Sequence, residues 1–175
     1  MRERVRTGVF AGSAAAAATA GVLIGFGLAR NAPFRLINSV ATIALGKDAA
    51  FQDGFVPTVT AVGLVVHVLS VLLWGVIFAI AAWRLRGWWL GLAGFLFAGI
   101  VFVIDILLLP SRIAPGFESA LSLPELVVVF ATLGVSLAAG VAIRRLGVGS
   151  RDEGSRRAHV TKIQSLREAQ DSSVL

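Results

Sequence analysis

The chain has 175 residues, of which 57% are hydrophobic and 15% are charged, with a formal net charge of +6. This apolar composition excludes an ordinary water-soluble domain. The basic residues gather at the edges of apolar runs and in the C-terminal segment, which indicates a membrane surface rather than nucleic acid as their partner. The chain has no cysteine, which excludes disulfide scaffolds, thiol catalysis and cysteine-ligated metals.

Apolar stretches long enough to cross a bilayer are the main feature of the sequence. A hydrocarbon core of about 30 Å needs about 20 helical residues. Prolines stand where helices tolerate them, with Pro57 and Pro124 in first turns and Pro110 at an end. We therefore predict an all-α integral membrane four-helix bundle in residues 1–146, with spans at about 7–29, 57–83, 87–110 and 124–143.

The first apolar stretch follows a basic head, as the core of a cleaved signal peptide would. It is longer than a usual signal core, and small residues recur in it every four positions, at Gly8, Gly12, Ala16 and Ala20. Such a repeat is typical of a helix-packing face. We predict that this stretch is retained as the first span.

The connections between the spans differ in basic charge. The N-terminal segment, the second connection (Arg84 and Arg86) and the segment from Arg144 onward together carry twelve Lys and Arg, whereas the first and third connections carry four. The positive-inside rule therefore predicts a multi-pass membrane protein with both termini in the cytoplasm. Arginine outnumbers lysine 14 to 2, which indicates a GC-rich bacterial genome, so the expected location is the bacterial inner membrane. Trp83, Trp88 and Trp89 flank the second connection, where indole rings favour the headgroup region.

The first connection contains an amphipathic segment. The apolar face would carry Phe34, Ile37, Val40, Ala41 and Ala44, and the polar face Arg35, Asn38, Ser39 and Thr42. This pattern predicts a short helix that either lies on the outer leaflet or is tucked against the bundle. Gly46 is expected to end it.

Residues 147–175 are polar, mixed in charge and poor in large apolar residues, so they cannot bury a core of their own. We predict a basic, disordered cytoplasmic tail, in which Val160, Ile163 and Leu166 could line one side of a short surface helix. Its basic residues and those just before it are placed to contact anionic lipid headgroups. They are Arg144, Arg145, Arg151, Arg156 and Arg157.

Two ionisable residues, His67 and Asp105, lie inside predicted spans, where such a group costs about 3 kcal/mol. Ser70 and Trp74 share the helical face of His67. In a functional interpretation, His67 relays protons or binds substrate, and Asp105 is its acid partner or the mouth of a polar path. In a structural interpretation, neutral His67 donates to a carbonyl or hydroxyl of a neighbouring helix and Asp105 pairs with Arg112.

Charged residues also mark the outer rim of the third connection, at Arg112, Glu118 and Glu125. Glu125 falls in the first turn of the fourth span, where a carboxylate caps the helix. If these side chains converged with Asp105 on a lipid headgroup, they would indicate a membrane-embedded lipid-modifying enzyme. No metal-ligand spacing or bis-histidine haem pattern occurs, so we predict neither a metal nor another cofactor.

The third span contains a run of glycines that superficially resembles a phosphate-binding loop. The run lies inside an apolar helix, where small residues allow two backbones to approach closely. We predict that these glycines, Gly87, Gly91, Gly94 and Gly99, serve helix packing.

Residues 34–79 carry an Asn–Ser pair, a Leu–Gly–Lys–Asp–Ala pattern and a His–x–x–Ser–x–x–x–Trp–Gly stripe. This segment, about a quarter of the chain, resembles a family of small, uncharacterised four-span proteins of bacterial inner membranes. The resemblance implies no activity. It implies that the first positions to test are Asn38, Gly46, Asp48, His67, Ser70 and Trp74.

Abundant packing surfaces without convergent chemistry favour a non-enzymatic role. The leading hypothesis is an accessory, scaffolding or interaction subunit that forms homo-oligomers or joins a larger membrane partner. One alternative is a small transporter or channel with a polar route past His67 and Asp105, and another is the lipid-modifying enzyme. The expected partners are the lipid bilayer and anionic headgroups, with no nucleic acid.

Overall fold

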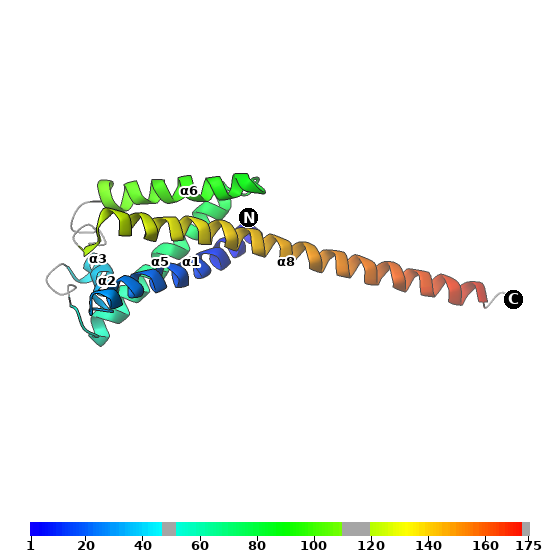
Figure 1. The fold of residues 1–175 in the computed structure, drawn as a ribbon. Helices are drawn as coiled ribbons and strands as arrows, with labels where there is room; N and C mark the ends of the chain where they lie inside the picture. The colour runs from blue at the N-terminus through cyan, green and yellow to red at the C-terminus, as the bar shows by residue number, and fades with distance from the viewer. Residues whose placement is uncertain (47–51, 110–119, 173–175) are drawn as a thin grey trace. The chain divides into compact units, whose positions relative to one another are not determined.

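The computed structural model describes residues 1–46, 52–109 and 120–172, with side-chain detail up to residue 147. These residues are all-helical and contain no β-strand, which confirms the predicted fold class. Figure 1 shows the helices in chain order. They are α1 (Arg2–Ala29), α2 (Arg35–Val40), α3 (Thr42–Leu45), α5 (Pro57–Ala81), α6 (Trp88–Phe102), the π-helix η1 (Val103–Leu108) and α8 (Leu123–Ser172).

Four helical stretches are long and apolar enough to cross a membrane, so the chain is a multi-pass membrane protein. Their large apolar side chains point outward in many places, as with Leu69, Phe95 and Leu107, because the surrounding solvent is lipid. The four spans agree closely with the predicted ones. They are Arg2–Ala29, Pro57–Ala81, Trp88–Leu108 and Leu123–Gly147.

Helices α1 and α5 cross with their backbones in direct contact (Figure 1). A Cβ atom on Gly75 of α5 would lie 2.6 Å from the Cα of Gly12 and 2.6 Å from the carbonyl oxygen of Gly8. Only glycine allows this approach. Ala11 of α1 lies equally close to α8, where a Cβ on Gly140 would be 2.7 Å from the Ala11 Cα. The small-residue face of α1 is therefore part of the bundle.

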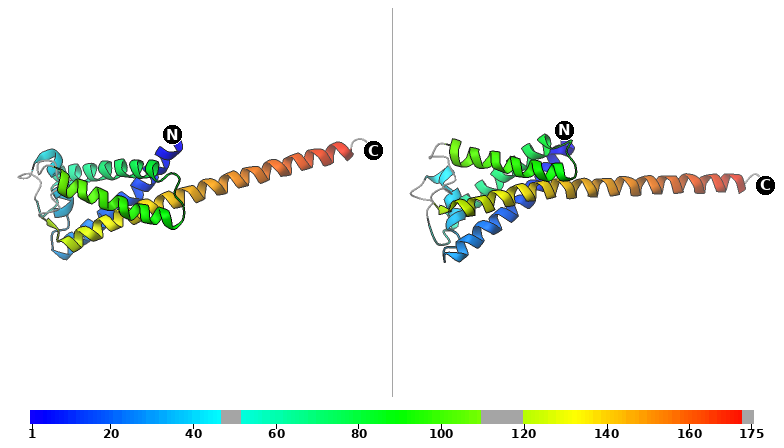
Figure 2. Two further views of the ribbon diagram at one scale, coloured as in Figure 1. Left: turned by 90° about the horizontal axis from the view of Figure 1, so that it is seen from above. Right: turned by 45° about the horizontal axis from the view of Figure 1, so that its top comes forward.

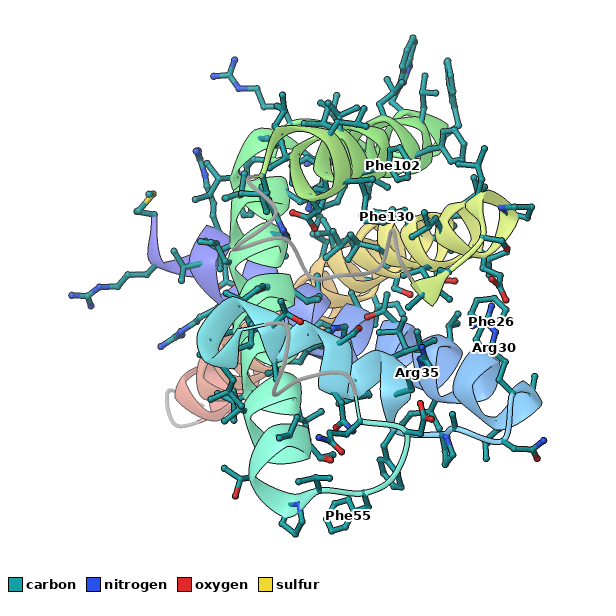
Figure 3. The ribbon with its side chains drawn as sticks, turned by 90° about the vertical axis from the view of Figure 1, so that its left-hand side faces the viewer. Phe26, Arg30, Arg35, Phe55, Phe102 and Phe130 are labelled. Atoms are coloured by element: carbon teal, nitrogen blue, oxygen red, sulfur yellow. The ribbon has the colours of Figure 1, made fainter. Side chains whose placement is uncertain are left out.

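Helix α6 lies beside the first half of α8 in the views of Figures 1 and 2. A Cβ on Gly94 would lie 2.6 Å from the carbonyl oxygen of Gly134. Phe102 and Phe130 join the same two helices, edge to face with centroids 5.2 Å apart (Figure 3). A glycine contact and an aromatic contact thus both join this pair of helices.

The packing prediction for the other glycines of this region is wrong. A Cβ on Gly91 or Gly99 would meet no described atom within 4 Å, since both glycines lie exposed on the outer side of α6. Gly87 stands before α6 with a φ of 57°, and it serves the turn rather than a helix contact.

The amphipathic segment of the first connection is tucked into the bundle as α2 and α3. The carbonyl of Ile37 lies against Gly63 of α5 so closely that no Cβ fits there. Three residues of its predicted polar face, Asn38, Ser39 and Thr42, are buried in this arrangement. The helix is interrupted at Ala41, and Gly46 ends α3 with a φ of 82°, as predicted for a terminating glycine.

The chain divides into two compact units, Met1–Val141 and Ala142–Leu175. In the second unit α8 continues as one helix to Ser172, where the sequence predicted disorder. Its Arg, Glu, Gln, Lys and Ala residues are good helix formers, so a helix can form there without a core. Arg151, Arg156 and Arg157 lie on this helix, and their side chains are outside the described atoms.

Candidate functional site

A cavity of about 250 Å³ lies within the first unit. Most of its lining is aliphatic or aromatic and comes from the four spans and from α2 and α3, with Leu23, Val101 and Leu133 as examples. This combination of apolar walls and few polar groups is typical of small-molecule sites. Four of the side chains that sequence patterns singled out line this cavity: His67, Ser70, Trp74 and Asp105.

The imidazole of His67 is buried and bonded to α1. Its Nε2 atom lies 3.2 Å from the carbonyl oxygen of Ala16 and 3.1 Å from the hydroxyl of Thr19. The carbonyl can only accept, and the Thr19 hydroxyl already donates to the carbonyl of Ala15 at 2.8 Å. Nε2 therefore carries the proton of the neutral ring, and Nδ1 keeps a lone pair.

The two nitrogens of His67 fit the two interpretations separately, Nε2 the structural one and Nδ1 the functional one. The Nε2 bond is the one that the structural interpretation requires, because it ties α5 to a carbonyl of a neighbouring helix. Nδ1 has no hydrogen-bond partner among the described residues, and His67 lines the cavity. Nδ1 is therefore available as an acceptor.

Asp105 reaches the cavity from the π-helical turn η1. In that turn the N–H of Leu109 donates to the carbonyl of Ile104 at 3.0 Å, which closes the C-terminal end of this span with a π-type bond. π-Helical turns are rare and frequently occur at functional sites. Within the described part of the chain no cation or donor contacts the Asp105 carboxylate, and Arg112, its predicted partner, lies outside that part.

The indole of Trp74 is held in place by aromatic neighbours. It meets Phe97 of α6 edge to face, with centroids 5.9 Å apart and an interplanar angle of 76°. Phe97 in turn contacts the buried Phe78 at 5.3 Å. Trp74 therefore lines the cavity with a ring that packs against Phe97.

Glu125 serves α8 rather than the cavity. Its carboxylate accepts from the backbone N–H of Ser122 at 2.8 Å and from the Ser122 hydroxyl at 2.7 Å, which is a capping arrangement at the helix start. It also accepts from Arg30 at the end of α1, at 2.6 Å; Figure 3 shows Arg30 there. No local sequence pattern could have indicated Arg30 as a partner of Glu125, because the two residues lie 95 positions apart in the chain. Arg112 and Glu118 lie outside the described residues, so the outer-rim convergence stays a prediction.

Asn38 joins three parts of the chain. Its Nδ2 donates to the carbonyls of Gln52 and Gly54 at 2.8 and 3.0 Å, and its Oδ1 accepts from the hydroxyl of Thr60 at 2.8 Å. Arg35 adds an ion pair with Asp53 at 2.8 Å. These bonds fix α2 and α3 beside the cavity, to which Val40 and Ile43 contribute. Asp48, which the resemblance also implied, is outside the described residues.

At the other end of the spans, aromatic rings gather around the short connection between α5 and α6. Trp88 and Trp89 are exposed, with ring centroids 3.7 Å apart. The guanidinium of Arg4 lies 5.0 Å from the ring centre of Trp83. Exposed indoles beside an arginine suit the lipid headgroup region.

The described residues include no group of three side chains that could hold a metal ion. The candidate site consists of the cavity, the acceptor Nδ1 of His67, the carboxylate of Asp105 and the ring of Trp74. No protein family, curated protein or solved structure matches the chain.

Proposed function

We propose that this membrane protein binds a small, predominantly apolar molecule in the cavity between its spans. The observation that carries the proposal is the meeting of His67, Ser70, Trp74 and Asp105 on one cavity, although Asp105 comes from a different span. A ligand there would find apolar walls for its body and a few polar groups for its orientation.

The polar groups support an occupant rather than a purely structural role. The hydroxyl of Ser70, the Nδ1 of His67 and the carboxylate of Asp105 have no partner among the described residues. Polar groups inside a membrane are normally satisfied, because lipid offers no hydrogen bonds. Water or a bound molecule would supply the missing bonds.

Binding fits the leading hypothesis of an accessory or interaction subunit, whose ligand would bias its association with a partner. Transport is the alternative. It would require in addition a path to the opposite membrane face, and the described cavity supplies only one segment of such a path.

Filling the cavity should remove the ligand. Ser70→Leu adds an apolar side chain to the cavity wall, so we expect a small molecule that co-purifies with the wild type to fall at least tenfold in the variant. Mass spectrometry of organic extracts from equal amounts of purified protein measures this loss.

Ser13→Leu is the matched control, because Ser13 is exposed on α1 and does not line the cavity. It should retain the wild-type complement of molecules. Equal recovery from the two variants, with both folded, would contradict the proposal.

We also propose that both termini face the cytoplasm of a bacterial inner membrane. The support is the excess of Lys and Arg on the two termini and on the connection between α5 and α6. Fusions after residues 85 and 175 to a fluorescent protein that matures only in the cytoplasm should fluoresce. Alkaline phosphatase, active only outside it, should be active after residue 52. The opposite pattern, or opposite results at residues 85 and 175, would exclude this topology.

A further inference from the structure

We propose that the ligand is a lipophilic ammonium, that is, a protonated amine on a single aryl or short alkyl body. This inference rests on the proposed function, since it names the class of molecule that the cavity takes. The juxtaposition that carries it is an acceptor of His67, the carboxylate of Asp105 and the ring of Trp74 on one apolar cavity.

The hydrogen-bonding groups of the cavity indicate whether the ligand carries donors or acceptors. Because Nε2 of His67 donates to α1, the Nδ1 atom can only accept. An ionised Asp105 also only accepts, and the Ser70 hydroxyl can accept as well. The ligand should therefore bring N–H or O–H donors, and an ammonium group brings three on one atom.

The charged side chains around the cavity narrow the class of ligand further. No arginine or lysine lines the cavity among the described residues, and Asp105 is the one acidic side chain in its lining. An anionic ligand would meet a like charge in a medium of low dielectric constant, which is strongly unfavourable. A neutral hydrocarbon would leave the acceptors without donors.

Aromatic rings favour the same class. Trp74 is held by Phe97, and Phe130 lines the cavity from α8. A cation over an aromatic face is attracted by the ring electrons, and the attraction is strongest where water is excluded. The cavity of about 250 Å³ has room for at least one ring or a short chain.

The test compares three molecules of similar shape: 2-phenylethylammonium, neutral propylbenzene and anionic 3-phenylpropionate. Each is titrated calorimetrically into the full chain in zwitterionic nanodiscs, with empty nanodiscs as the blank. We expect the ammonium to bind and the anion not to bind. Asp105→Asn should weaken ammonium binding at least tenfold and leave propylbenzene binding unchanged.

Asp53→Asn is the matched control, because Asp53 is an exposed carboxylate that pairs with Arg35 and does not line this cavity. It should bind the ammonium as the wild type does. Trp74→Leu is the second variant, for the case that Asp105→Asn fails to fold, and it should weaken ammonium binding more than propylbenzene binding.

The outcomes separate the two proposals. If propylbenzene binds and the ammonium does not, or if the folded Asp105 variant binds the ammonium as tightly as the wild type, the ligand class is overturned and cavity binding stands. If none of the three molecules binds and Ser70→Leu retains everything that co-purifies with the wild type, cavity binding itself fails.

Discussion

Replacing Gly75 with valine is expected to lower the free energy of unfolding by about 3 kcal/mol, near the upper end of the usual cost of overpacking. The first carbon of any side chain at this position would overlap the Gly12 Cα and the Gly8 carbonyl oxygen. Both obstacles are backbone atoms, which cannot rotate away. Helices α1 and α5 would have to separate, and the contacts along their whole crossing would weaken.

The measurement is unfolding of the purified protein in detergent, followed by thermal denaturation or by titration with a denaturing detergent. Gly25→Val is the control, since a Cβ at Gly25 meets nothing within 4 Å and the substitution has the same effect on side-chain size. It should change the stability by no more than about 0.5 kcal/mol. If the two variants were equally stable, the close crossing of α1 and α5 would be disproved.

Asn38→Leu is expected to lower the free energy of unfolding by about 2–3 kcal/mol. The change keeps the number and branching of the side-chain heavy atoms and removes every hydrogen bond that they make, so the Thr60 hydroxyl and the carbonyls of Gln52 and Gly54 each lose their bond to Asn38. Leaving buried polar groups unpaired costs about 1–3 kcal/mol for each group, and partial exposure of the two carbonyls reduces the sum. Asn38→Asp should cost more, because a carboxylate would face two carbonyl oxygens.

Gln52→Ala is the control for this region, because the Gln52 side chain is exposed and its carbonyl remains in place. It should be neutral within about 0.5 kcal/mol. Thr60→Val tests the pair directly: combined with Asn38→Leu it should cost less than the sum of the two single changes. Strict additivity would show that the Asn38–Thr60 bond does not contribute to stability.

The spans were predictable because a bilayer imposes one simple demand, about 20 apolar residues in helical form. The arrangement of α2 was not. Amphipathic reasoning directs polar residues toward water, yet Asn38 is buried, because its partners Gln52, Gly54 and Thr60 stand far along the chain. Local periodicity contains no information about such distant partners.

The candidate site was predictable in part. Helical spacing placed His67, Ser70 and Trp74 on one face. Asp105 was singled out by its charge inside an apolar span. Thr19, which shares the cavity and contacts His67, carries no signal within its alanine-rich stretch. The π-helical turn that holds Asp105 is not marked by any proline or glycine in Val103–Leu108, so only the structure reveals it.

The buried position of α2 also bears on how the protein is made. All three partners of Asn38 are synthesised after it, and one of them lies in the next span. When α2 leaves the ribosome, none of these partners has been made, so the hydrogen bonds of Asn38 form only after residues 52–60 have followed. The contacts that hold α2 against α5 are therefore completed after the chain of the second span has been synthesised.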